Sequence, residues 1–509
     1  MQRRNFLNLA PAGLLASLVA QWGVAQAQTT ATGVQLALAF PFDVENWDPT
    51  SRIVPHATSL FKCVFDQPLE FAADNTLQPG VVKHYEWLDA GGLQLALDFR
   101  DDVYFHNGDK MTSEDFKFTF LERPRADRTV QLGYIWGGID RIDTPSATRA
   151  VVHFKAPMVT APQYLGFAGS FILPKAYIQK VGYEAFLAKP VGTGPYKLAA
   201  YQRDSRIVLE PFAQYWGGAP ERAVTIQIIK DPTARVSAVQ SSQVALSYNL
   251  AVREAVRLGK LPSHTAQLTP TVDTYLIHML NSGATQDKNV RLAMHHAIDK
   301  DALSKALLQG VSRPLHTASP PGAPAHDRTF SFAFNPEKAK QLLADSGYGP
   351  GKPVKFKFFA TNGVHPLDFD MARAIVQMWK KVGIEAELEA IEMGKYFQLA
   401  AAGKLEGPVL WFWTNSSADP ELYAGSYLNA DTAFSVWRSE DVMEKLRPLL
   451  VELDYDKRIA GYKHFNLWAV EQGYSLPLLQ GVSTVVHLKT LSNYRAYRNG
   501  WILPAQWKA

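Results

Sequence analysis

Residues 354–391 hold the pattern that most constrains the fold of this chain. VKFKFF at 354–359 predicts a strand, and IEAELEAI at 384–391 predicts a second strand with apolar residues on one face and glutamates on the other. Between them, apolar residues recur at helical spacing and stop at Gly383. These residues are Met371, Ile375, Met378, Trp379 and Val382. Strand, helix and strand in this order form a βαβ unit, which predicts an α/β fold.

Capping signals elsewhere predict further helices. Ser113 is expected to cap one helix, and Asp299 and Asn335 are expected to cap two more, which Gly310 and Gly347 end. A chain of 509 residues has room for roughly two to four domains. We therefore expect an α/β protein with more than one lobe and mixed sheets.

Composition and charge narrow the class of protein. Hydrophobic residues make up 47% of the chain and charged residues 20%, which is the balance of a globular protein with a large core. The formal charge is +4 and basic residues are interspersed with acidic ones, so we expect no nucleic-acid partner. Cys63 is the only cysteine, which excludes an intramolecular disulfide.

The first 27 residues are similar to an export signal. Arg3 and Arg4 precede a mostly apolar stretch, and an A-x-A cleavage site at 25–27 would make Gln28 the first mature residue. The arginine pair is similar to a twin-arginine signal, with a general secretory signal as the alternative. No other stretch has the roughly 18 apolar residues of a membrane span. We expect a soluble periplasmic protein, without a lipid anchor because Cys63 lies far from the cleavage site.

The sequence shows no arrangement of residues typical of catalysis or metal binding. It has no HExxH, no paired CxxC and no glycine-rich phosphate loop. The serine of GFAGS at 166–170 is out of place for a nucleophile elbow. His295 and His296 are adjacent, so on a helix they point about 100° apart and cannot hold one ion together. We expect no cofactor, no metal site and no enzymatic activity, which leaves a binding protein as the natural class.

Five stretches carry a more specific resemblance. In their order and spacing they resemble the family 5 extracellular solute-binding proteins, which include the dipeptide-, oligopeptide- and nickel-binding proteins of bacterial ABC importers. The stretches are VENWDPT (44–50) with QPGVVKHYEW (78–87), FRDDVYFHNGDKMTSEDFKFTF (99–120), GTGPYKLAAYQRDSRIVLEPFAQYWGGAP (192–220), NVRLAMHHAIDKDALSKALLQG (289–310) and FNPEKAKQLLADSGY (334–348). Most of them also have ordinary structural roles as turns and helix caps, so we interpret them as features of the fold.

The resemblance implies a fold like that of the type II periplasmic binding proteins. Two lobes joined by a hinge would close over a ligand, and a third, inserted domain would extend one of them. A membrane permease of the ABC type would receive the ligand, a peptide or peptide-like solute, from a monomeric binding protein. The expected boundaries are 1–27 for the signal peptide, 28–70 and 190–275 for the first lobe, 71–189 for the inserted domain, 276–485 for the second lobe, and 486–509 for a return to the first lobe.

The stretch WFWTNSSADP at 411–420 is the expected ligand site. In the family, an acidic residue four positions before the proline pairs with the ammonium group of a peptide, and Ser416 stands at that position here. An alternative alignment places Asp419 at the acidic site. The expected ligand-binding residues are Trp411, Trp413, Asn415, Ser416, Ser417, Asp419 and Tyr423, with Trp413 as a stacking wall.

Ser416 also leaves other functions open. A hydroxyl cannot give an ammonium the charge-assisted hydrogen bond of a carboxylate, which is worth about 1.5–3 kcal/mol. The ligand could therefore be a metal chelate, an opine-like compound or a sugar derivative. A periplasmic chaperone or signalling receptor is a further alternative, and an exported hydrolase with a dispersed triad is the most distant one.

Overall fold

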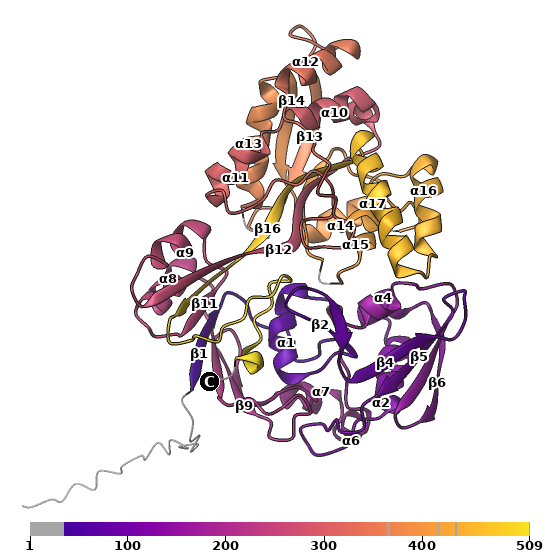
Figure 1. Cartoon of the computed structure of the whole chain (residues 1–509), viewed down its shortest axis with the longest axis vertical. Coiled ribbons are helices and arrows are strands. Elements are labelled where there is room, and N and C mark those ends of the chain that lie inside the picture. The colour runs from indigo at the N-terminus through magenta and orange to yellow at the C-terminus, as the bar shows by residue number, and fades with distance from the viewer. Residues whose placement is uncertain (1–34, 364–366, 416, 433–434, 508–509) are drawn as a thin grey trace, which may run out of the picture.

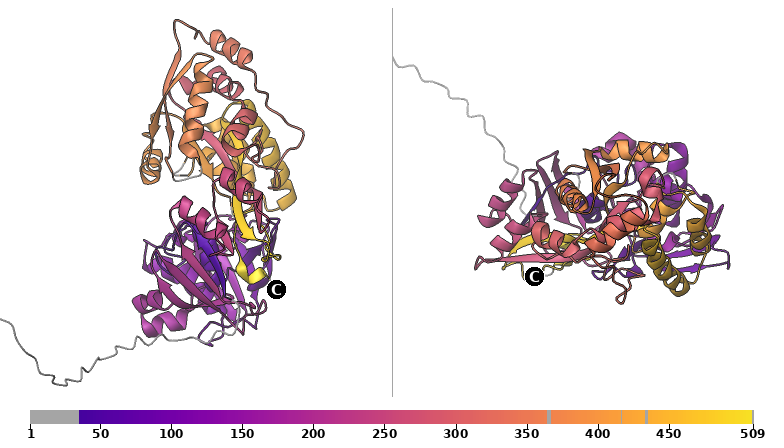
Figure 2. Two further views of the ribbon diagram at one scale, coloured as in Figure 1. Left: turned by 90° about the vertical axis from the view of Figure 1, so that its left-hand side faces the viewer. Right: turned by 90° about the horizontal axis from the view of Figure 1, so that it is seen from above.

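The structure, a computed structural model, describes residues 35–363, 367–415, 417–432 and 435–507, and leaves aside the side chains of residues 423–426. The expected export signal therefore falls outside the described residues. Figure 1 shows an upper lobe, which contains β13–β15 and α10–α17, and a lower lobe, which contains β1–β11 and α1–α9. Turned by 90°, the two lobes stand one above the other (Figure 2).

One mixed sheet of ten strands runs through both lobes of the described chain. In spatial order its strands are β14 (Ile384–Ala390), β13 (Val354–Ala360), β15 (Val409–Trp413), β12 (His264–His278), β16 (Ser475–Leu488), β11 (Leu246–Tyr248), β1 (Leu36–Phe40), β10 (Val224–Ile228), β9 (Arg206–Pro211) and β8 (Tyr196–Gln202). The lower lobe adds a four-stranded antiparallel sheet of β4 (Val82–Trp87), β5 (Gln94–Phe99), β7 (Arg149–Phe154) and β6 (Ile139–Ser146), and the short pair β2 (Leu69–Phe71) and β3 (Leu77–Pro79).

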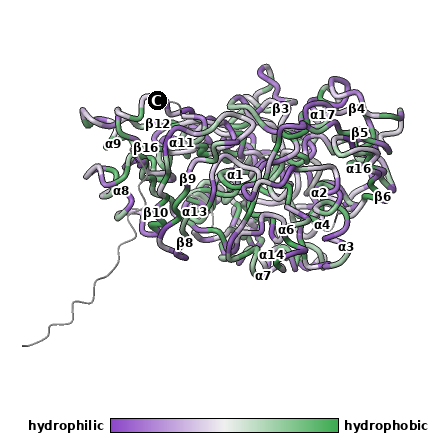
Figure 3. Tube along the Cα trace, turned by 90° about the horizontal axis from the view of Figure 1, so that it is seen from below, coloured by the Kyte–Doolittle hydropathy of each residue, from purple (hydrophilic) through white to green (hydrophobic). Residues whose placement is uncertain are grey.

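Helices cover these sheets in both lobes (Figure 1). Those of the lower lobe are α1 (Thr58–Val64), α2 (Ser113–Lys117), α3 (Arg123–Ala126), α4 (Leu132–Trp136), α5 (Ala161–Tyr164), α6 (Lys175–Val181), α7 (Tyr183–Ala188), α8 (Pro232–Gln240) and α9 (Val252–Leu258). Those of the upper lobe are α10 (Lys288–His296), α11 (Lys300–Leu308), α12 (Pro336–Asp345), α13 (Asp368–Lys380), α14 (Met393–Ala401), α15 (Pro420–Leu428), α16 (Glu440–Leu450) and α17 (Tyr455–Glu471). Seen from below, hydrophobic and hydrophilic residues are interspersed along the chain (Figure 3).

The βαβ unit predicted at 354–391 is confirmed as β13, α13 and β14. The two strands are parallel neighbours, with Val354 opposite Ile384. Trp379 from the helical stripe is fully buried, and its indole nitrogen donates a hydrogen bond to the carbonyl oxygen of Met294 at 2.9 Å. Because the side chain fills the core beneath the sheet, its removal would cost about 3–5 kcal/mol.

The predicted helix caps are confirmed with one correction. The side chains of Asp299 and Asn335 accept hydrogen bonds from the third residue of the helices that follow them. The helix expected to be capped by Ser113 is instead capped by Thr112, which forms a capping box with Asp115. The prediction was wrong by one residue because Thr112, Ser113 and the acids after them all suit a helix start, and only the extended backbone of Thr112 identifies the cap.

Two long strands connect the lobes. β12 has 15 residues and β16 has 14, and they pair antiparallel from His264 opposite Leu488 to His278 opposite Ser475. At about 3.3 Å per residue each strand spans roughly 50 Å, enough to enter both lobes. The pairing is irregular between Pro270 and Thr274. This irregular segment separates the part of β12 in the lower lobe from the part that pairs with β15 in the upper lobe.

Candidate functional site

A cavity lies between the two lobes. Its volume is about 760 Å³, within the range of about 300–1,000 Å³ that is usual for small-molecule sites. The lower lobe contributes β2, β3, β4 and α5, and the upper lobe contributes residues 322–328, Ala418 and α17. The lining side chains include Phe71, Asp74, Asn75, Tyr85, Trp87, Gln163, His326, Arg328, Tyr455 and Arg458. Aromatic, amide and basic groups therefore meet in one space that neither lobe could form alone.

Three lining side chains carry buried polar atoms that lack a hydrogen-bond partner among the described residues. Asn75, Gln163 and Arg458 are 5%, 7% and 2% exposed. Both polar atoms of the Asn75 side chain, Oε1 of Gln163 and Nη1 of Arg458 have no partner. A buried polar atom without a hydrogen bond is costly, so such atoms around a cavity are suited to a polar ligand or ordered water.

The aromatic residues of β15 pack mainly inside the upper lobe. Trp411 is 4% exposed and stacks on Tyr396, with ring centroids 4.4 Å apart. His278 lies between Trp411 and Tyr427, and its Nδ1 is hydrogen-bonded to the Tyr396 hydroxyl at 2.8 Å. Burial lowers the pKa of His278 to about 3, so this ring is neutral near pH 7. Trp411 therefore belongs to the core that holds the end of β15 in place.

Trp413 lies closer to the cleft than Trp411. Its side chain is half-buried and packs against Val272, Ala318 and Ala323, the last of which lines the cavity. Its indole nitrogen has no hydrogen-bond partner in the described part of the chain. An aromatic wall with a free donor suits a ligand that offers both an apolar surface and an acceptor.

The turn after β15 is held by its own polar groups. Asn415, Ser417 and Asp419 are fully buried. Oδ1 of Asn415 accepts hydrogen bonds from the amide and the hydroxyl of Ser417 at 3.1 and 2.8 Å, and its Nδ2 donates to the carbonyl oxygen of Asp419 at 2.8 Å. Ala418 takes a left-handed conformation with φ of 53° and packs against Phe71 and Trp501. The turn thereby brings the upper lobe into contact with the lower lobe and the C-terminal segment.

Asp419 already has an internal cation. Nη2 of Arg458 donates to Oδ2 of Asp419 at 2.6 Å, and both side chains are almost completely buried. Burial outweighs the attraction of Arg458 and raises the pKa of Asp419, and burial also raises the pKa of nearby Glu421 to about 7. In the alternative alignment Asp419 would bind a ligand ammonium, which would have to share this carboxylate with Arg458.

Two of the expected site residues cannot be placed. Ser416 lies outside the described residues, and so does the side chain of Tyr423, whose backbone belongs to α15. The structure thus brings Trp413, Asn415, Ser417 and Asp419 together at the end of β15 and places Trp411 behind them.

The cavity residues Asn75, Gln163 and Arg458 were missed by sequence reasoning. They come from three distant segments, and none belongs to a motif that signals binding. Arg458 gave no signal either, because an arginine is usually exposed and nothing in its local sequence marks it as buried.

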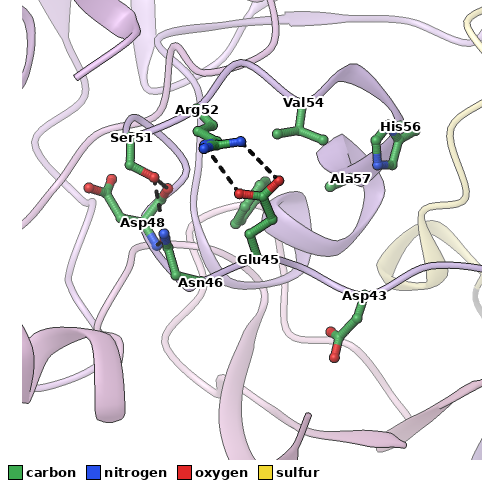
Figure 4. Close-up of a pocket in the computed structure, with 10 residues that line it drawn as sticks. Asp43, Glu45, Asn46, Asp48, Ser51, Arg52, Val54, His56 and Ala57 are labelled. Atoms are coloured by element: carbon green, nitrogen blue, oxygen red, sulfur yellow. Dashed lines mark hydrogen bonds and ion pairs between the residues drawn. The ribbon is translucent and has the colours of Figure 1, made fainter. Parts of the chain in front are cut away.

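A second, much smaller pocket lies in the loop after β1 (Figure 4). Its volume is about 40 Å³, which leaves room for only a few water molecules. Arg52 and Glu45 form an exposed ion pair at 3.2 Å beside it. Asp48 accepts hydrogen bonds from the amide and hydroxyl of Thr50 at 2.9 and 2.7 Å and pairs with Arg123. This part of the VENWDPT stretch therefore stabilises a loop, as expected for a feature of the fold.

No helix in the described part of the chain is long and apolar enough to cross a membrane. Over the same residues, no group of three or more His, Cys, Asp and Glu side chains is arranged to hold a metal ion.

Comparisons with known proteins agree with the fold. The Dipeptide-binding protein of Escherichia coli (strain K12) is 24% identical over 446 residues, which cover 81% of this chain and 83% of the relative. The Glutathione-binding protein GsiB of Salmonella typhi is 22% identical and covers 97% of this chain and 96% of its own.

Solved structures show the same architecture. The periplasmic binding protein DppA from Helicobacter pylori in complex with the peptide STSA has a TM-score of 0.78 at 21% identity, over 94% of this chain and 98% of the other. NikA from Brucella suis in complex with Fe(III)-EDTA has a TM-score of 0.83 at 20% identity, over 93% and 99%. The model for bacterial extracellular solute-binding proteins, family 5 Middle, matches residues 76–434, so this chain belongs to the family 5 extracellular solute-binding proteins.

Proposed function

We propose that this protein is the substrate-binding subunit of an ABC importer and captures a peptide or peptide-like solute between its two lobes. The observation that carries the proposal is the interlobe cavity of about 760 Å³, lined by both lobes and by buried amide and guanidinium atoms that lack a hydrogen-bond partner among the described residues. Peptide bonds offer donors and acceptors that such groups can satisfy. A ligand that contacts both lobes favours the closed state over the open one, because it binds the closed state more tightly.

The proposal includes the export of the protein, its location and its membrane partner. The leader with Arg3 and Arg4 would direct export by the twin-arginine route, and cleavage after Ala27 would release a mature chain that begins at Gln28. The protein would act in the periplasm as a monomer without a lipid anchor or nucleic-acid partner. An inner-membrane permease would receive the solute from the closed form. The expected domain boundaries belong to the same proposal, with lobes at 28–70, 190–275 and 276–485, an inserted domain at 71–189 and a return at 486–509.

The roles of individual residues follow from their positions. Asn75, Gln163 and Nη1 of Arg458 would bind polar groups of the solute, and Trp413 would form an apolar wall. Four neighbouring residues are buried and would support the turn and strand β15 without contacting the solute. These residues are Trp411, Asn415, Ser417 and Asp419. Contacts of Ser416 and Tyr423 with the solute stay predictions.

A thermal-shift screen of the purified protein tests the proposal. The panel contains dipeptides, tripeptides, glutathione, nickel–histidine, Fe(III)-EDTA and sugars. A ligand at 100 times its Kd should add about 2.7 kcal/mol to the stability, which raises the melting temperature measurably. The Asn75→Ala variant should weaken the response to peptides, whereas Asn107→Ala, on an exposed turn, should not. A response to chelates or sugars alone would replace peptides as the solute, and no response to any member would overturn the proposal.

A further inference from the structure

The edge of the upper sheet that faces the lower lobe contains an acidic side chain that the cavity lining does not include. β13 and β15 are parallel neighbours, so their carboxyl ends, at Ala360 and Trp413, lie at the same edge. In open α/β sheets, ligands bind in the crevice outside the carboxyl ends of the strands. Asp273 reaches this edge from β12, immediately before Thr274, which is paired with Trp413.

Asp273 lies where several segments of both lobes converge. It belongs to the irregular part of β12 between Pro270 and Thr274. A Cβ atom added to Gly481 of β16 would lie 2.8 Å from its Cβ, so β16 approaches it closely. Tyr248 of β11 in the lower lobe is within electrostatic reach of Asp273. The preceding residue, Val272, packs with Trp413 and with the cavity residue Ala323.

One oxygen of the Asp273 carboxylate is hydrogen-bonded within the described residues, and the other is not. The side chain is 8% exposed. The Thr271 hydroxyl donates to Oδ2 at 2.7 Å, whereas Oδ1 has no hydrogen-bond partner among the described residues. No Lys, Arg or His in the described part of the chain compensates its charge. Burial therefore raises the pKa of Asp273 to about 7, although the Thr271 hydroxyl and the backbone amide of Asn415 have a smaller effect that lowers this pKa.

An unpaired carboxylate at this depth is a poor structural element. A buried charge without a counter-ion destabilises a fold, and here neither an internal cation nor a full set of hydrogen bonds offsets that cost. The half-buried ring of Trp413 lies along the same strand pair, and aromatic faces attract cations. The missing partner is thus a donor with a positive charge, which the ligand of a binding protein can supply.

We propose that Asp273 binds a positively charged amine of the solute, with Oδ1 as the acceptor and Thr271 as the residue that orients the carboxylate. The proposal rests on the function proposed above and narrows its solutes to those that carry an ammonium group. Each N–H of that group is a donor, so Oδ1 gains a charge-assisted hydrogen bond when the solute enters.

Calorimetric titrations of the full-length protein at pH 8 test this role. The solutes are tripeptides with a free amino terminus, the same tripeptides with an acetylated amino terminus, and putrescine as an amine without a peptide bond. The wild type should bind the free tripeptides roughly 10- to 100-fold more tightly than the acetylated ones, the factor that corresponds to one charge-assisted hydrogen bond. Asp273→Asn should abolish this preference, and the matched variant Asp101→Asn, at an exposed carboxylate, should keep it.

The outcomes separate this inference from the proposed function. Equal binding of free and acetylated peptides by the wild type, or a preference that survives in Asp273→Asn, would overturn the role of Asp273 and leave the importer function intact. Binding of putrescine but of no peptide, lost in Asp273→Asn, would support Asp273 and overturn the peptide part of the function. If no solute binds, both are overturned.

The wild type alone provides a second test if Asp273→Asn does not fold. Tyr248 and Tyr275 are the ionisable groups affected by Asp273, and burial raises the pKa of both, so they stay neutral near pH 7. Affinity for the amine-bearing solutes should therefore fall as the pH drops from 8 to 5 and Asp273 takes up a proton. An affinity that stays constant over this range would overturn the inference.

Discussion

Replacing Arg458 by methionine should destabilise the protein strongly at pH 8. Arg458 and Asp419 are 2% and 1% exposed at their side chains, and their charged groups are 2.6 Å apart. Removing one partner of such a pair leaves an uncompensated buried charge, which costs about 3–5 kcal/mol. Glu421 adds to the effect, because Arg458 also lowers the pKa of that carboxylate.

The cost should depend on pH in a definite direction. Burial raises the pKa of Glu421 to about 7 and raises the pKa of Asp419 as well, even with Arg458 present. Without the cation both pKa values rise further, so both groups become protonated as the pH falls from 8 to 5. Neutral carboxyl groups need no counter-ion, and the difference in the free energy of unfolding between the wild type and the variant should shrink accordingly.

Urea unfolding followed by tryptophan fluorescence at pH 8 and pH 5 measures this difference. Lys457→Met is the matched control, because Lys457 is 73% exposed and pairs with Asp454 at 3.4 Å on the surface; its loss should cost less than about 1 kcal/mol. Combining Arg458→Met with Asp419→Asn should recover part of the stability. A loss below about 1 kcal/mol for Arg458→Met, or the same loss at both pH values, would refute the reasoning.

Three further variants test other parts of the structure by their melting temperature and urea unfolding. Asp273→Asn should stabilise the ligand-free protein at pH 8 by up to about 4 kcal/mol, because burial raises the pKa of Asp273 from its ordinary value of 3.8 to about 7 in the folded protein. The wild type therefore loses stability as the pH rises from about 4 through 7, and the asparagine variant does not. A gain in stability that persists at pH 4 would contradict this reasoning. Asn415→Ala should cost about 2–3 kcal/mol, because three hydrogen bonds of a buried turn are lost, and a neutral effect would show that the turn does not depend on them. Gly192→Ala should cost more than about 2 kcal/mol, because the new Cβ would lie 2.0 Å from the carbonyl oxygen of Val64, whereas Gly138→Ala, with no atom within 4 Å, should not.

Features that depend on neighbours in the sequence were predicted well. The βαβ unit around Trp379 and the caps at Asp299 and Asn335 follow from periodicity and from side chains that act within one helical turn. Gly192 opens the stretch at 192–220, which was interpreted as a feature of the fold, but its role includes the close approach of Val64, which is 128 residues away in the sequence (192 − 64). Local patterns identify the glycine but not the reason for it.

The candidate site was predicted less completely for the same reason. The cavity needs Asn75 and Gln163 from the lower lobe and Arg458 from the upper lobe, and no local pattern brings these residues together. The partner of Asp419 is 39 residues away, so the sequence could not show that its charge is already balanced. A missing counter-ion, as at Asp273, is visible only when all the neighbours of a carboxylate are known.

The stretch WFWTNSSADP therefore has a more structural role than its polar and aromatic composition suggests. Its amide, hydroxyl and carboxylate groups at Asn415, Ser417 and Asp419 are used inside the protein, and they fix a turn whose Ala418 touches Phe71 across the cleft. The hydrogen bonds of Asn415 hold this segment where Ala418 packs with residues of the lower lobe. A solute that draws the neighbouring carboxylate of Asp273 into an ion pair would act at the same edge of the sheet. Recognition of charge and contact between the lobes would then occur side by side, so an amine that satisfies Asp273 would also favour the closed arrangement of the lobes.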